Sequence, residues 1–122
     1  MNKDQGVSFA NIGWSGWIGS ITGINEEMLA ISEIGVSYPD ETFGRESRRG
    51  VPFTFILRDV LQFDSHLDES MSRMQDSERT CNLILGVGDG KITPSDDGEV
   101  IPFHAIQYNT ATLLRIFKLI KI

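Results

Sequence analysis

The sequence has a single cysteine, Cys81, among its 122 residues. One cysteine cannot form an internal disulfide, and it cannot build a zinc site that relies on several cysteine ligands. Long apolar runs are also missing, because no stretch approaches the ~18 apolar residues that a membrane-spanning helix needs. The first six residues are polar and lack the apolar stretch of a signal peptide. The sequence therefore predicts no membrane span, and it leaves the compartment unknown.

Basic residues are fewer than acidic ones: Lys and Arg number 11, Asp and Glu number 17, and the net charge is −6. A general nucleic-acid binder needs a basic face, so this balance argues against a nucleic-acid partner. The last ten residues carry Arg115, Lys118 and Lys121 among apolar side chains and no acid. The composition, 40% hydrophobic and 23% charged, is typical of one globular domain with a core of its own.

Residue patterns predict an α+β fold in the order β-hairpin, two helices, β-hairpin. Residues 17–36 have apolar segments on both sides of a polar turn, which indicates a hairpin. A loop with proline, glycine and charges follows over residues 37–50. Apolar residues at helical spacing then predict one helix from Pro52 and a second from Ser65. A strand at residues 81–87, turn signals at 89–90 and 96–98, and a further strand from 99 to 101 complete the second hairpin.

The strand at 81–87 is apolar throughout rather than alternating, which is the pattern of a strand covered on both faces. Such a strand needs a helical layer on one side and a second sheet on the other. Two hairpins supply too few strands for a second sheet. We therefore expect a partial sandwich that belongs to a larger fold.

None of the candidate cofactor-binding or metal-binding motifs in the sequence is complete. The glycines at 86, 88 and 90 before Lys91 lack the further glycine and the Ser or Thr of a phosphate-binding loop. The acidic stretch from 89 has proline and valine where a calcium-binding EF-hand loop needs glycine and glutamate. His66 and His104 have no ligand partners nearby in sequence. The sequence predicts no metal site and no cofactor.

Asn82 is the residue that most needs an explanation, because it is an amide at the head of an apolar strand. Burying an amide without partners costs roughly 1–3 kcal/mol. Asn82 therefore either satisfies a structural turn or donates a hydrogen bond to a ligand. Cys81 lacks a cationic neighbour that would activate a thiol, so we expect a packing residue. Trp14 and Trp17 could line an apolar substrate pocket or cover the core.

Three segments together resemble the acyl-coenzyme A:6-aminopenicillanic acid acyltransferase-like family of N-terminal-nucleophile (Ntn) hydrolases, which is related to choloylglycine hydrolase and acid ceramidase. They are GSITGINEEMLAI at residues 19–31, GVPFTFILR at 50–58 and CNLILGV at 81–87. They are similar, in order, to the family's hairpin, to its helix ending in leucine-arginine, and to its strand headed by a small residue and an asparagine. The resemblance covers roughly residues 11–100, the central part of the family's fold.

This resemblance implies a four-layer αββα sandwich and the hydrolysis or acyl transfer of linear amide bonds. In the family, an N-terminal cysteine attacks the amide carbonyl to form an acyl-enzyme, with its own α-amino group as base. An asparagine N–H stabilises the oxyanion, and Asn82 is the residue that matches it. An N-acyl small molecule would be the substrate of a full-length relative.

The chain departs from the family at the front, because Met1 stands there and no cysteine precedes the first hairpin. We therefore expect residues 1–112 to form an incomplete Ntn-hydrolase-like domain that is inactive alone for lack of its nucleophile. Residues 113–122 would form a basic amphipathic strip if helical, and a tail outside the domain otherwise. The alternative function is a non-enzymatic interaction or self-association module that uses exposed sheet edges or this tail.

Overall fold

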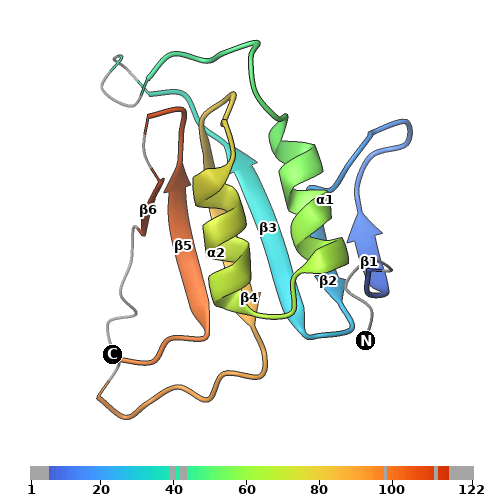
Figure 1. Ribbon diagram of the computed structural model, residues 1–122, viewed down its shortest axis with the longest axis vertical. Helices are drawn as coiled ribbons and strands as arrows, with labels where there is room; N and C mark the ends of the chain where they lie inside the picture. Colours follow the sequence, from blue (N-terminus) through green and yellow to red (C-terminus); the bar gives the residue numbers. More distant parts are fainter. Residues whose placement is uncertain (1–5, 39–40, 42–43, 98, 112, 116–122) are drawn as a thin grey trace.

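The computed structural model describes residues 6–38, 41, 44–97, 99–111 and 113–115. They form one six-stranded antiparallel sheet whose strand order follows the chain, and two helices (Figure 1). The strands are β1 (Phe9–Ile12), β2 (Thr22–Asn25), β3 (Leu29–Gly35), β4 (Leu83–Asp89), β5 (Phe103–Tyr108) and β6 (Leu113–Arg115). The helices α1 (Phe53–Phe63) and α2 (Leu67–Asp76) lie between β3 and β4 in the chain. The predicted α+β class and element order are confirmed, with β1 and β6 added at the two edges. The last predicted strand is wrong in its position, because it lies at Phe103–Tyr108 and not at 99–101.

Both helices lie on the same face of the sheet (Figure 1). Pro52 immediately precedes α1, where its missing N–H removes no helical hydrogen bond. The apolar residues that predicted the helix do form its buried stripe, and Thr54 joins them. The core lies between this helical layer and the facing side chains of β3, β4 and β5. Its fully buried members include Val60, Met74, Leu85, Ile106 and Tyr108.

The first hairpin is present, but its first strand begins later than expected, at Thr22 instead of residue 17. The preceding residues form a loop held against α1, in which the Ser20 N–H donates to the Thr54 carbonyl at 2.9 Å. Gly19 has a φ of +94°, and a Cβ there would meet the backbone of Thr54 at 2.6 Å. This close approach requires glycine at residue 19. The segment before Thr22 is therefore a loop against α1 and not the expected strand.

The expected second sheet is not part of the described chain. On β4, the side chains of Leu83, Leu85 and Val87 are buried against the helices, while Ile84 on the opposite face is only half-buried. The cover that the apolar run at 81–87 predicts for the second face of β4 therefore stays a prediction. Glycines at 86 and 88 make the strand read as continuous, although only one face packs on the core within the described residues.

The segment after residue 112 begins as a strand. β6 pairs with β5, with Leu113 opposite Tyr108 and Arg115 opposite Ile106. The helical alternative is therefore wrong for Leu113–Arg115, which extend the sheet. The remainder of the predicted basic strip, including Lys118 and Lys121, lies outside the described residues.

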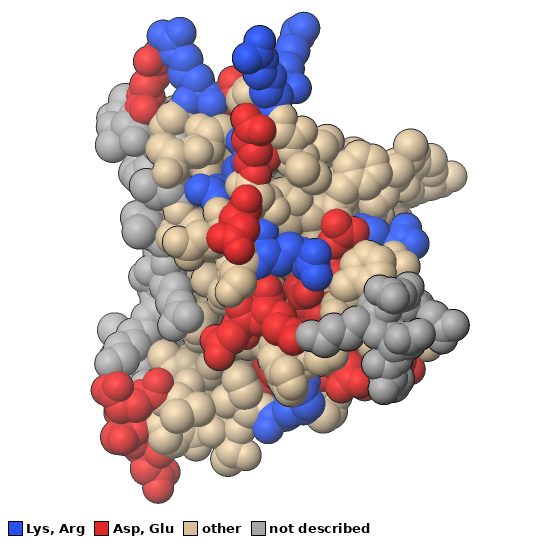
Figure 2. Space-filling view, viewed as in Figure 1, with Lys and Arg blue, Asp and Glu red and all other residues tan. Residues whose placement is uncertain are grey.

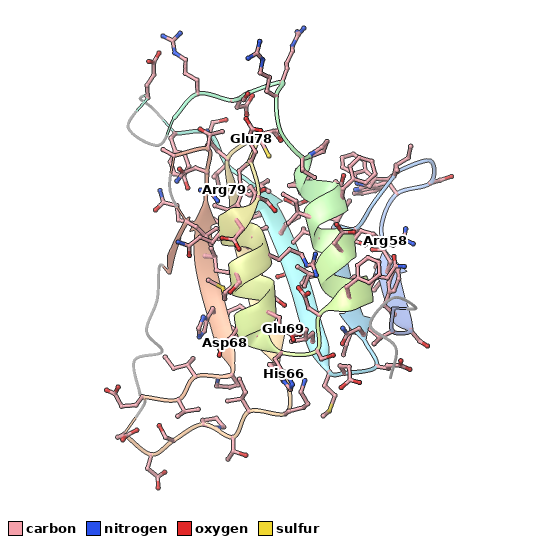
Figure 3. The ribbon with its side chains drawn as sticks, viewed as in Figure 1. Arg58, His66, Asp68, Glu69, Glu78 and Arg79 are labelled. Atoms are coloured by element: carbon pink, nitrogen blue, oxygen red, sulfur yellow. The ribbon has the colours of Figure 1, made fainter. Side chains whose placement is uncertain are left out.

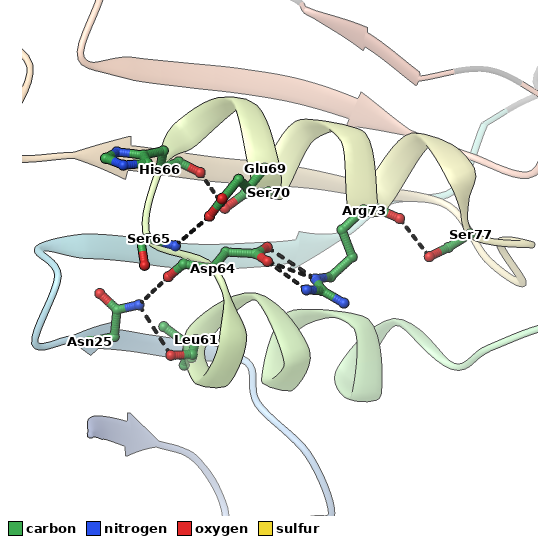
Figure 4. A network of polar contacts seen from close by, with 9 residues as sticks. All are labelled: Asn25, Leu61, Asp64, Ser65, His66, Glu69, Ser70, Arg73 and Ser77. Carbon is green, nitrogen blue, oxygen red and sulfur yellow. Dashed lines mark hydrogen bonds and ion pairs between the residues drawn. The ribbon is translucent and has the colours of Figure 1, made fainter. Parts of the chain in front are cut away.

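A polar junction joins the first hairpin to the turn between the helices (Figure 4). The Asn25 amide donates to the carbonyls of Leu61 and Asp64 at 3.1 and 2.9 Å, and its Oδ1 accepts the Leu29 N–H at 2.9 Å. The buried Asp64 carboxylate pairs with Arg73 of α2 at 2.6 Å. Buried polar groups that are this fully bonded fix the position of the helices on the sheet.

Asp89 at the end of β4 holds the start of α2. Its carboxylate accepts the Leu67 N–H at 3.3 Å and the Lys91 N–H at 3.0 Å, and it pairs with the Lys91 ammonium at 2.9 Å. Burial alone would raise the pKa of Asp89, but the hydrogen bonds and charge of Lys91, with the Leu67 N–H, lower it below its ordinary value of 3.8.

The lowered pKa of Asp89 predicts a pH dependence of stability. A group whose pKa is lower in the folded state stabilises the fold above its unfolded pKa, and this contribution is lost as the pH falls through the folded value. We expect Asp89→Asn to cost about 1–3 kcal/mol at neutral pH. The difference from the wild type should shrink below pH 3.8, the ordinary value. Urea unfolding of both proteins across this pH range measures it, and a difference that stays constant would contradict the role of the charge.

Candidate functional site

Asn82 lies immediately before β4, under the loop that connects β3 to α1. Its carbonyl accepts the Val36 N–H at 3.4 Å, which joins it to the start of that loop. Its side chain lines a hollow of about 430 Å³ together with residues of the loop. The loop residues are Ser37, Tyr38, Glu41, Gly44, Arg45 and Glu46.

The side chain of Asn82 is not used by the fold. Its Oδ1 is buried, and neither this atom nor Nδ2 has a hydrogen-bond partner among the described residues. An unpaired buried polar atom costs about 1–3 kcal/mol, so this amide lowers the stability of the folded state. Of the two explanations that the sequence left open, the structural turn finds no support, and the Nδ2–H group remains able to donate to a ligand.

The walls of the hollow are polar and carry both signs of charge. Glu41 and Arg45 form an exposed ion pair at 2.5 Å, one helical turn apart in sequence. Glu46 adds a carboxylate, and Ser37 and Tyr38 add hydroxyl groups. Arg48 and Arg49 follow in the chain, and both are exposed. Such a lining suits a small polar molecule better than an apolar one.

Cys81 packs against the core on the helical side, while its neighbour Asn82 lines the hollow. Burial raises the pKa of the Cys81 thiol; Thr80 lowers it through a hydrogen bond, and the carboxylates of Glu46 and Glu33 raise it further. The thiol is therefore protonated at neutral pH and lacks the thiolate that a nucleophile needs. The position of Cys81 against the core agrees with the expectation that it is a packing residue.

Trp14 and Trp17 lie in the loop between β1 and β2, where the Trp17 N–H donates to the Trp14 carbonyl at 3.0 Å. Both indoles are exposed, so they do not cover the core. Neither lines the hollow that contains Asn82. The structure thus separates the three predicted site residues into two places.

Arg79 is a residue of this region that the sequence analysis missed. Its guanidinium donates to the carbonyls of Met74 and Gln75 at 3.0 and 2.9 Å, and to that of Asn109 at 2.7 Å (Figure 3). These bonds satisfy carbonyls in the last turn of α2 and link the end of this helix to Asn109, the residue that follows β5. Arg79 itself lies two residues before Cys81. An arginine just past a helix C-terminus is a known signal for such a cap. The acceptor on β5 could not be read from the sequence.

The described residues include no group of three or more His, Cys, Asp or Glu placed to hold a metal ion. No helix within the described ranges is long and apolar enough to cross a membrane. The hollow around Asn82 contains neither cysteine nor lysine among its described lining residues. The arrangement can therefore orient a polar ligand, but its described lining supplies no cysteine or lysine nucleophile.

Two proteins of Dictyostelium discoideum are similar to this chain. Protein dcd1A is 31% identical over 106 residues, which are 87% of this chain and 21% of the relative. Protein dcd1B is 35% identical over 86 residues, which are 70% of this chain and 16% of the relative. The chain thus spans about a fifth of the length of these relatives or less. No protein-family model matches it.

Proposed function

We propose that this chain is a partial relative of the Ntn-type linear-amide hydrolases and acyltransferases, in which Asn82 is the oxyanion donor. The observation that carries the proposal is the Asn82 side chain, which faces a polar hollow without any partner among the described residues. The order of hairpin, two helices and strands is compatible with half of an αββα sandwich. The uncovered face of the sheet would receive the second sheet in a longer protein.

The chemistry assigned to Asn82 is charge stabilisation. When a nucleophile adds to an amide carbonyl, its oxygen becomes an oxyanion, and an N–H aimed at that oxygen binds it more tightly than the ground-state carbonyl. Removing one such donor from an active enzyme costs about 2.7–4 kcal/mol of transition-state stabilisation. The N-terminal cysteine nucleophile is not present in this chain, so we propose that the chain alone is inactive toward N-acyl substrates.

Replacing Asn82 by Ala tests its role through stability. A ligand-binding amide without partners is a burden on the fold, so N82A should leave the free energy of unfolding unchanged or raise it by up to about 1 kcal/mol. The matched control is Asn25→Ala, which removes three buried hydrogen bonds and should cost about 2–4 kcal/mol. Urea unfolding of both variants provides the measurement. If N82A costs as much as N25A, Asn82 is structural.

The wild type and N82A also test the activity. Incubating the purified chain with simple N-acyl amides should show no turnover, since it carries no N-terminal cysteine. Binding is read separately from the side-chain amide resonances in nitrogen–proton NMR spectra. A carboxylate product analogue should shift the Asn82 signal and leave that of Asn11, which donates to the Gly19 carbonyl, in place. Turnover that disappears in N82A would refute the inactivity and support the site.

The alternative function, a non-enzymatic self-association module, is favoured by a different feature. The face of the sheet opposite the helices is uncovered and has no charged residue at the described strand positions. This feature does not depend on Asn82.

A further inference from the structure

The face of the sheet turned away from the helices is uncharged across five strands. Side chains alternate along each strand, and the register places every second residue of β1 to β5 on this open face. The residues of the open face are Ala10, Ile12, Thr22, Ile24, Ala30, Ser32, Ile34, Ile84, Gly86, Gly88, Phe103, Ala105 and Gln107. None of them is Asp, Glu, Lys or Arg, although 23% of the sequence is charged.

Charged side chains lie elsewhere. They gather over the helices and at both ends of the molecule in Figure 2, which is viewed from the helical side. An antiparallel sheet with one face in water normally alternates apolar inward residues with polar outward ones. The open face breaks this rule. Ile34, Ile24 and Phe103 are 62%, 51% and 46% exposed on it, which leaves a contiguous apolar patch.

The open face has both a projection and a recess. Ile34 projects near one end of β3, with Ile84 opposite it on β4. At the other end, a hollow of about 390 Å³ lies between Ile24 and Pro102, with Ala30 and Gly88 as its floor. A two-fold axis that lies between the two sheets and runs perpendicular to the strands would bring the projection of one copy over the recess of the other. An isologous interface needs this kind of self-complementarity.

We infer that in this 122-residue chain a second copy takes the place that the proposed sandwich gives to a second sheet, so that the open faces of the two copies pack against each other. Sheets that pack in this way lie about 10 Å apart, and the small residues of β4 and β5 permit that approach. The six strands have 31 residues in all, which at ~3.3 Å per residue and ~4.8 Å between strands give roughly 490 Å² per copy, or about 1,000 Å² in total. This area is at the lower limit of a specific interface, so the dimer is weak.

The second copy is a better match for this face than a charged or membrane surface. A partner that offers ion pairs would find no charge to bind at the described positions of the face. A membrane surface requires a basic rim, whereas the described residues of the open face include no Lys or Arg. A second open face offers apolar area and a complementary recess, and it buries no charge.

Sedimentation of the 122-residue chain over about 1–500 µM tests the proposal, with an expected dissociation constant of about 10–100 µM. Ile34→Glu places a charge on the projecting side chain that would enter the recess of the second copy, and it should raise this constant at least about tenfold. Ile34 is exposed in the monomer, so the variant should fold normally, as circular dichroism checks. The matched control is Phe55→Glu on the outer side of α1, where the side chain is 43% exposed. It should leave the dimer intact.

Three outcomes would overturn the inference. The first is a monomer at every concentration. The second is a dimer that I34E leaves unchanged, because contact would then run through a sheet edge. The third is a dimer that F55E weakens as much as I34E, which would place the helices at the interface. The unfolding test of N82A is made in dilute solution, where the chain is expected to be monomeric. Its result therefore separates this inference from the proposed oxyanion role.

Discussion

Replacing Arg73 by Met should lower the free energy of unfolding by about 2–4 kcal/mol, because it leaves the Asp64 carboxylate buried and unpaired. The Asp64 side chain is only 3% exposed, and Arg73 donates to both of its oxygens. Loss of one partner of a buried pair typically costs 3–5 kcal/mol, and we expect less here because Arg73 itself is 33% exposed. Urea unfolding at neutral pH measures the loss.

Two variants define the cause of that loss. Arg73→Met combined with Asp64→Leu removes both charges, so it should recover at least half of the stability that R73M loses. Arg45→Met breaks the exposed pair with Glu41, and it should change the stability by less than about 0.5 kcal/mol. If the double variant is as unstable as R73M, the loss comes from the contact of the Arg73 guanidinium with the Phe63 ring and not from the unpaired carboxylate.

The elements with a clear period were predictable from the sequence. The helical stripe around Ile56, Leu57 and Val60 is set by local spacing and buries the side expected of it. β1 was missed because it is four residues long and mostly exposed, so its pattern carries little signal. It becomes a strand because Ala10 and Asn11 pair with β2, a contact that the loop of residues 13–21 brings about.

The candidate site was predictable only in part. Asn25 and Asn82 are both asparagines beside apolar strands, and the sequence offers no way to say which one is satisfied. The difference depends on acceptors far away in the chain: Asn25 reaches Leu61 and Asp64, while Asn82 meets none within the described residues. The hollow beside Asn82 depends on how the loop of residues 36–50 lies over β4, which local spacing does not encode.

Leu85 and Ile84 are neighbours on β4 that test how many faces of the sheet are covered. Leu85 is fully buried against the helices, so Leu85→Ala should cost about 3–5 kcal/mol through lost burial and the cavity it leaves. Ile84 points to the open face, so Ile84→Ala should cost only about 1 kcal/mol in dilute solution. Urea unfolding at about 1 µM, below the dimer range, measures both.

The same pair reports on association when the protein concentration is raised. Binding of a second copy stabilises only the folded state, so the wild type should become more stable at about 500 µM. Ile84→Ala should then lose part of this gain, and the cost of Leu85→Ala should stay the same. If Ile84→Ala costs as much as Leu85→Ala already in dilute solution, the open face is covered within a single chain. In that case the uncharged residues of the open face form a second core and not an interface.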